Sequence, residues 1–206
     1  MTKIFHNSAR QLLNLFFVIT FSFLFCLTAF GQSNLFGEKL TSNYKSDLNK
    51  ITNPAIERQR IVGKNKSDDN NGKLLSQLER QAFDILNQRR DENGLSPIKW
   101  SEDMAKIARI HSQDMAQYNY FSHAGRDGKM VNDRADLLGF SDWQAIGENI
   151  AFNRGYEKPA EFACEGWMKS SAHRENILNA RWKEAGIGVA LAADGSYYFT
   201  EVFILK

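Results

Sequence analysis

Cysteine is scarce in this chain: the 206 residues include only Cys26 and Cys164. Cys26 lies in an N-terminal apolar run that we expect to be removed, which leaves Cys164 as the one remaining thiol. One thiol cannot form an intramolecular disulfide, so the class of small disulfide-stapled domains is excluded. The fold must therefore be held by its hydrophobic core, in which we expect Cys164 to be a small buried apolar residue.

An excess of charge of one sign is also absent. The chain has 26 Lys and Arg against 24 Asp and Glu. Lys3 and Arg10 lie in the expected leader, and removing these two leaves 24 basic residues, equal to the 24 acidic ones. Such a balance favours no nucleic-acid partner, because binding to phosphate requires a basic surface.

Long hydrophobic runs are missing except at the N-terminus, where Leu12 to Phe30 carries no charge. The run follows Lys3 and Arg10 and ends at Ala29-Phe30-Gly31, a pattern typical of signal peptidase sites. Residues 1–31 are predicted to be a cleaved secretory signal, which makes the protein secreted or periplasmic. The alternative is an uncleaved membrane anchor, since about 20 apolar residues cross a bilayer. Membrane contact is expected only through this segment, if it stays.

Residues 32–73 are polar and irregular, and we interpret them as a flexible stem before a folded domain at residues 74–206. Within the domain, apolar residues spaced three or four apart predict four helices. These run from Leu74 toward Asn93, from Ser101 to Ala116, from Val131 to Leu138, and from Pro159 to Met168.

Strand patterns occur at residues 145–152, 185–192 and 196–205. The last two flank Asp194-Gly195, a strong hairpin signal. Because the hairpin closes the chain and helices interrupt the strands, we predict the α+β class, with a small antiparallel sheet covered by helices.

Two histidines and one glutamate are candidates for chemistry. His123 and His173 lie in predicted loops after helices, and loops on a rigid scaffold often carry function. Glu148 lies inside an apolar strand, where a carboxylate is costly unless it is paired. Their spacing alone leaves two interpretations open, a shared site or separate structural histidines.

Five motifs follow one another along the chain: NQRRDENGLSPIKW, FSHAGRDG, GENIA, WMKSSAHRENIL and EAGIGVA. In this order they resemble the CAP superfamily, also called SCP, which includes the cysteine-rich secretory, antigen 5 and pathogenesis-related 1 proteins. The likeness covers about residues 74–206 and looks closest to the disulfide-free bacterial branch.

The resemblance implies an α-β-α sandwich whose central cleft collects two histidines and acidic residues, a set that holds a divalent metal such as zinc in some relatives. The first histidine falls on His123, the acidic residue of the GEN motif on Glu148, and the second histidine on His173. A further glutamate of animal and plant relatives falls on Ser170. A serine hydroxyl supplies neither the negative charge nor the basicity of that carboxylate.

Three more residues are expected to support the site: Arg134, Asn149 and Asn176. Arg134 is either an ion-pair partner of Glu148 or a solvated helix residue. His111 matches no position of the family's set, and we expect it to be a half-buried helix histidine bonded to a neighbour.

Two functions are compatible with these residues. The favoured hypothesis is a non-catalytic extracellular or envelope binding module that requires no cofactor, its ligand a small molecule, a lipid or a protein. The alternative is a metal-assisted hydrolase or protease, in which His123 and His173 hold zinc and Glu148 activates water. Ser170 argues against the second hypothesis, because it leaves the acidic set incomplete.

Overall fold

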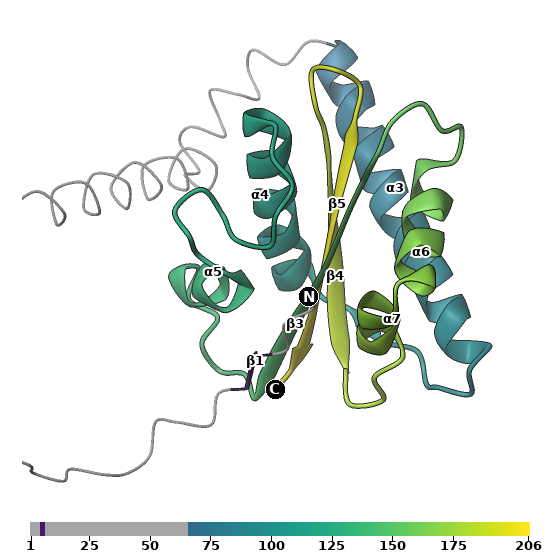
Figure 1. Ribbon diagram of the computed structural model, residues 1–206, viewed down its shortest axis with the longest axis vertical. Helices are drawn as coiled ribbons and strands as arrows, with labels where there is room; N and C mark the ends of the chain where they lie inside the picture. Colours follow the sequence, from purple (N-terminus) through teal and green to yellow (C-terminus); the bar gives the residue numbers. More distant parts are fainter. Residues whose placement is uncertain (1–4, 7–65) are drawn as a thin grey trace, which may run out of the picture. The chain divides into compact units, whose positions relative to one another are not determined.

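The computed structural model describes residues 5–6 and 66–206 (Figure 1). The predicted signal segment, apart from Phe5–His6, lies outside the described residues, and so does the predicted stem up to residue 65. In the described part, no helix combines the length and the apolar character needed to cross a membrane.

The domain is a three-layer α+β sandwich, as predicted. The sheet has the order β1-β3-β5-β4-β2, in which β3, β5 and β4 are antiparallel neighbours. Helices α4 and α5 cover one face, and α3, α6 and α7 cover the other (Figure 1). The strands are β1 (Phe5–His6), β2 (Lys99–Trp100), β3 (Ala145–Asn153), β4 (Glu184–Leu191) and β5 (Tyr197–Leu205). The helices are α3 (Lys66–Asp91), α4 (Glu102–Tyr118), α5 (Val131–Leu137), α6 (Pro159–Lys169) and α7 (Ser171–Ile177).

Three details differ from the sequence-based expectation. Helix α3 begins at Lys66, so the last eight residues of the predicted stem are helical. This start of the helix, about two turns, extends beyond the core, so its residues lack an apolar period. Periodicity therefore cannot detect this part of the helix. His173 lies in the short helix α7 rather than in a loop, and the two-residue strand β2 pairs with β4 in parallel.

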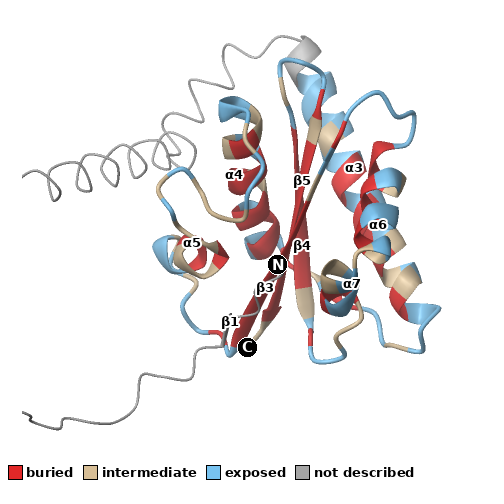
Figure 2. Cartoon of the chain, in the orientation of Figure 1, coloured by how far each residue is buried: buried red, intermediate tan, exposed pale blue. Residues whose placement is uncertain are grey.

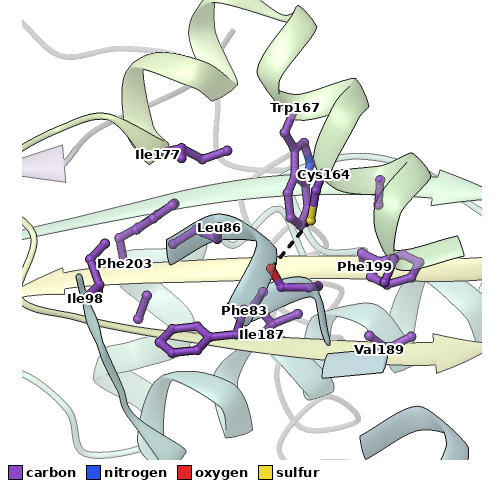
Figure 3. Close-up of a cluster of buried hydrophobic side chains, with 14 of the residues drawn as sticks. Phe83, Leu86, Ile98, Cys164, Trp167, Ile177, Ile187, Val189, Phe199 and Phe203 are labelled. Atoms are coloured by element: carbon purple, nitrogen blue, oxygen red, sulfur yellow. Dashed lines mark hydrogen bonds between the residues drawn. The ribbon is translucent and has the colours of Figure 1, made fainter. Parts of the chain in front are cut away.

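The sheet is buried on both faces, as the red strands of Figure 2 show. Figure 3 shows the larger apolar cluster, between the sheet and α3, α6 and α7. Cys164 is part of it: its side chain is buried, and its Sγ lies 3.6 Å from the carbonyl oxygen of Ala82. Burial raises the pKa of this thiol far above its usual range, so Cys164 is a packing residue and not a thiolate nucleophile.

Two glycines allow α4 to lie directly against β4. A Cβ atom built on Gly186 would come 2.1 Å from the amide nitrogen of Ala105, and one on Gly188 would come 2.1 Å from that of Arg109. Both obstacles are backbone atoms, which cannot move aside as a flexible side chain does. Ser112 uses this close approach, because its hydroxyl donates to the carbonyl of Gly188 at 2.9 Å.

We expect Gly188→Ala to lower the free energy of unfolding by about 3 kcal/mol or more, because the added methyl group must push α4 away from the sheet. The measurement is urea unfolding followed by circular dichroism. Gly166→Ala in α6 is the matched control: nothing lies within 4 Å of its added Cβ, and alanine favours a helix. Equal stability losses in both variants would show that helix–sheet contact is not the constraint.

Candidate functional site

The carboxylate of Glu148 is the centre of the candidate site. It lies on β3 and is 2% exposed. Its Oε1 accepts a hydrogen bond from Nδ1 of His123 at 2.8 Å, and its Oε2 accepts one from Nη2 of Arg134 on α5. We call His111, His123, Arg134, Glu148 and His173 the His–Glu cluster.

Arg134 also shapes the loop that carries His123. Its Nη1 donates to the backbone carbonyls of His123, at 3.1 Å, and Lys129, at 2.9 Å. The guanidinium is almost fully buried, so these bonds and the ion pair satisfy a charge that would otherwise be costly. One side chain therefore neutralises Glu148 and also fixes the backbone of its histidine partner.

Local sequence explains how this loop forms. Helix α4 ends at Asn119, which takes the left-handed conformation (φ 52°) that asparagine tolerates better than most residues. The hydroxyl of Ser122 then accepts the amide of Ala124 at 3.1 Å, and the amide of Gly125 donates to the carbonyl of Lys129 at 2.8 Å. These short-range bonds close the loop and turn His123 toward the strand.

The partners of Glu148 determine its protonation. Burial alone would raise the pKa of its carboxyl, but the charge of Arg134 and the hydrogen bond from His123 outweigh burial and lower this pKa to about 2. Glu148 is therefore an ionised acceptor at neutral pH, so Nδ1 of His123 must carry a hydrogen. When the ring is neutral, its Nε2 is left as an acceptor.

His111 belongs to the cluster, where the sequence indicated only a half-buried helix histidine bonded to a neighbour. It is 1% exposed, and its Nε2 lies 2.9 Å from the carbonyl oxygen of Ser122 and 4.0 Å from Oε1 of Glu148. Burial, and then the charge of Arg134, lower its pKa to about 4, so the ring is neutral at pH 7. Its Nδ1 has no hydrogen-bond partner among the described residues. The only hint in the sequence is an ionisable side chain within the apolar pattern of α4.

His173 approaches His123 from α7. The two ring centroids are 6.5 Å apart, with 39° between the ring planes. His173 is half-buried, and burial together with the neighbouring His123 lowers its pKa. Ser170 is also half-buried, at the N-cap of α7, and its hydroxyl makes no capping bond to the helix. The rings of His123 and His173 are thus neighbours, and neither is fully enclosed by protein.

Asn149 points to the opposite face of β3 from Glu148, because successive strand residues alternate. Asn176 lies on that same side, on α7. Nδ2 of Asn176 donates to the backbone carbonyl of Glu148 at 3.3 Å and to Oδ1 of Asn149 at 3.0 Å. Nδ2 of Asn149 donates to the backbone carbonyl of His173 at 3.3 Å. The two amides thus join α7 to the strand that carries Glu148 without touching its carboxylate.

An exposed aromatic surface lies next to the cluster. Phe121, two residues before His123, is 46% exposed, and Phe152, on the same strand face as Glu148, is 52% exposed. The centroids of these two rings are 5.0 Å apart, and Phe152 stacks on Tyr198 at 5.8 Å. A separate open hollow of about 600 Å³, bordered by Arg80 and Asp84 of α3 and by Glu161 of α6, includes no residue of the cluster.

The donor set does not make a complete zinc site. Within residues 66–206, no group of three or more His, Cys, Asp and Glu side chains is placed to hold a metal ion. Zinc in proteins usually has three or four protein ligands. Here Glu148 is held by Arg134 and His123, which leaves two imidazoles and the uncharged Ser170. Zinc binding by His123 and His173 stays a prediction.

Comparisons with known proteins agree with the resemblance of the motifs. The profile of the cysteine-rich secretory protein (CAP) family matches residues 83–203. The uncharacterized membrane protein YlbC of Bacillus subtilis is 38% identical over 146 residues, which cover 71% of this chain and 40% of the relative. The uncharacterized protein YkwD of the same organism is 34% identical over 132 residues, covering 64% and 49%.

One solved structure is similar in both sequence and fold. It is an extracellular protein containing an SCP domain from Bacillus anthracis, with 33% identity and a TM-score of 0.55. The match covers 64% of this chain and 41% of that protein. This chain thus spans less than half the length of these three relatives.

The ion pair leads to a double-mutant prediction. Arg134→Met should lower the free energy of unfolding by about 3–5 kcal/mol, because it leaves Glu148 buried and unpaired. Adding Glu148→Gln should restore part of that loss, since an amide carries no charge. Both variants and the double variant are compared by urea unfolding. Additive losses would show that the two side chains are not coupled.

Acid should destabilise the protein in two steps. His111 has a pKa of about 4 in the folded state, below its ordinary 6.5, so its contribution is present above pH 6.5 and is lost as pH falls toward 4. Glu148 has a pKa of about 2 against 4.5, so its contribution is lost between those values. Thermal unfolding measured against pH should show both losses. His111→Gln should remove much of the first and leave the second, whereas an unchanged first step would contradict the assignment.

Proposed function

Because this chain belongs to the CAP family of cysteine-rich secretory proteins, we propose that its folded domain is a non-catalytic binding module whose ligand contacts the His–Glu cluster and the neighbouring aromatic surface. The observation that carries this proposal is the state of Glu148. Both of its carboxylate oxygens accept hydrogen bonds from protein groups, and its pKa is about 2. A carboxylate so weakly basic and so buried is suited to orienting His123 and not to abstracting a proton from water.

The cluster offers uncharged hydrogen-bonding groups to a ligand. The negative charge of Glu148 is balanced by Arg134, so no net charge remains at the centre. His173 has a lowered pKa and is neutral at pH 7, and Nε2 of His123 is an acceptor when that ring is neutral. Hydroxyl or amide groups match this combination better than a phosphate or an ammonium group does.

The aromatic surface adds an apolar contact. Phe152 is four residues from Glu148 along β3, which is about 13 Å in an extended strand. Exposed aromatic rings beside polar groups are typical of sites for ligands that have one polar and one apolar part. We therefore infer an amphipathic ligand, with hydroxyl groups near His123 and His173 and an apolar chain across Phe121 and Phe152.

The hydrolase alternative has less support. Its water-activating residue would be Glu148, which is buried under His123 and paired with Arg134. Ser170 occupies the place of the additional carboxylate of animal and plant relatives. No observation on the described residues favours this function over binding.

We also infer export to the periplasm or the cell exterior. The apolar run at residues 12–30 supports this inference, and so does the description of the similar Bacillus anthracis protein as extracellular. Retention of the run as a membrane anchor is the alternative, and YlbC is described as a membrane protein. An envelope lipid is an accessible ligand in either location.

The test uses monolauroylglycerol below its critical micelle concentration as a probe. Saturable NMR shifts are expected for His173 and Phe152, with glycerol alone giving much weaker shifts. His173→Ala and Phe152→Ala should each weaken binding about tenfold, equivalent to about 1.4 kcal/mol. Leu191→Ala is the matched control, because Leu191 is also an exposed apolar residue, at 37%, but lies at the end of β4.

Other outcomes would contradict the proposal. Equal loss of binding in Leu191→Ala would indicate non-specific adsorption of the acyl chain. Zinc chloride is titrated in parallel: saturable binding of zinc, lost in His123→Ala and in His173→Ala, without binding of monolauroylglycerol, would replace the amphipathic ligand by a metal. If the protein hydrolyses the probe and Glu148→Gln abolishes this hydrolysis, the enzyme alternative is established.

A further inference from the structure

Glu201 is a second buried carboxyl group, on β5 directly opposite Asn149 of β3. Its exposed fraction is 0%. Oε2 accepts a hydrogen bond from Nδ2 of Asn149 at 3.1 Å, and Oε1 has no partner among the described side chains and backbone groups. Such a group is expensive to bury when it is ionised and much less so when it is protonated.

No cationic side chain of the described residues forms an ion pair with Glu201. On this face its titratable neighbours are Arg90 of α3 and Cys164 of α6, whose pKa Glu201 itself raises, and its cross-strand neighbour on β4 is Ile187. The guanidinium of Arg90 donates to the backbone carbonyls of Ser96, Ile177 and Asn179, and not to Glu201. Burial therefore raises the pKa of Glu201 well above its usual range, against the smaller opposing effects of Asn149 and Arg90. Its surroundings therefore favour the protonated form, in contrast to those of the ionised Glu148.

A hydrogen-bond chain joins this acid to the cluster. Nδ2 of Asn149 donates both to Oε2 of Glu201 and to the backbone carbonyl of His173. Oδ1 of Asn149 accepts from Asn176, whose amide also donates to the backbone carbonyl of Glu148. If the amide of Asn149 were rotated by 180°, its oxygen would face the backbone carbonyl of His173 and its NH2 group would face Nδ2 of Asn176. The NH2 group is therefore fixed between Oε2 of Glu201 and the backbone of His173, so a single donor group connects Glu201 with α7.

We propose that Glu201 is a positioning residue of the His–Glu cluster: through Asn149 it holds the backbone of His173 and so maintains the distance between the two imidazole rings. This role rests on the proposed binding function of that cluster. Glutamine of similar shape could accept the same hydrogen bond from Asn149 without burying an ionisable group, so the two residues differ in their response to pH. Ionisation of Glu201 would favour opening of the contact between Asn149 and α7, because a buried unpaired charge is costly.

The experiment uses the full chain without ligand, in the wild type and as Glu201→Gln, Glu201→Ala and Asn149→Ala. The readouts are hydrogen exchange of the α7 amides and the imidazole NMR signals of His173. Glu201→Ala and Asn149→Ala should each raise α7 exchange about tenfold and shift the His173 signals. The double variant Glu201→Ala/Asn149→Ala should raise α7 exchange no more than either single variant, because each single substitution already breaks the same series of hydrogen bonds.

The pH dependence separates positioning from simple packing. Because the folded-state pKa of Glu201 lies above 4.5, its stabilising contribution is complete below pH 4.5 and is lost as pH rises toward the folded value. Glutamine does not undergo this loss, so Glu201→Gln should raise the melting temperature at neutral pH by about 2–4 °C. The ratio of α7 exchange in the wild type to that in Glu201→Gln should rise as pH increases above 4.5.

Glu79→Gln is the matched control. Glu79 is also buried, but both of its oxygens bind Arg109, at 2.9 and 2.7 Å, so its replacement should lower the melting temperature. A wild-type to Glu201→Gln exchange ratio that stays constant with pH would overturn the proposal, as would unchanged His173 signals in Glu201→Ala. If Glu201→Ala does not fold, the pH dependence of the exchange ratio between the wild type and Glu201→Gln is by itself the test of the proposal. All readouts use ligand-free protein, so their failure is distinct from a failure of the binding proposal.

Discussion

The candidate site depends on the burial of one negative charge, that of Glu148. A carboxylate that is 2% exposed requires a cation, and Arg134 supplies it. The same guanidinium also binds the carbonyls of His123 and Lys129. One side chain therefore both neutralises Glu148 and fixes the loop that carries His123. The orientation of His123 is thus a consequence of charge compensation inside the sandwich, so its imidazole is fixed by protein contacts alone.

This arrangement is possible because the helix layer lies unusually close to the sheet. Gly186 and Gly188 let the backbone of α4 touch β4, and Ser112 then binds Gly188 and, at 2.8 Å, Thr200 of β5. His111, one residue before Ser112, is consequently held within 4.0 Å of Glu148. A wider spacing would admit water around the carboxylate and weaken its attraction to Arg134. The packing of small residues and the electrostatics of the cluster therefore depend on one another.

Much of the fold could be predicted from the sequence, because apolar periodicity and Asp194-Gly195 report local structure. The elements α4, α5, β3 and the β4–β5 hairpin lie close to their predicted positions. The helical state of Ser171–Ile177 was missed, since seven residues with few apolar positions carry no clear period. The place of His111 beside Glu148 and the role of Glu201 were not predicted, for another reason. Their importance comes from contacts across layers and strands, with Glu148 and Asn149, and spacing along one element says nothing about such contacts.

Glu148 and Glu201 approach the cluster from opposite faces of the sheet, and their surroundings favour opposite protonation states. Glu148 accepts hydrogen bonds from a guanidinium and an imidazole N–H, which lower its pKa, whereas Glu201 accepts one from an amide only, and burial raises its pKa. If the two carboxyl groups exchanged these partners, Glu148 would favour its protonated form and Glu201 its ionised form. The kind of donor decides whether a buried acid keeps its proton. Glu148 orients His123 directly, and Glu201 is connected to His173 through Asn149. The spacing of the two imidazoles is therefore linked to two acids: Glu148, whose stabilising contribution is lost as pH falls, and Glu201, whose stabilising contribution is lost as pH rises.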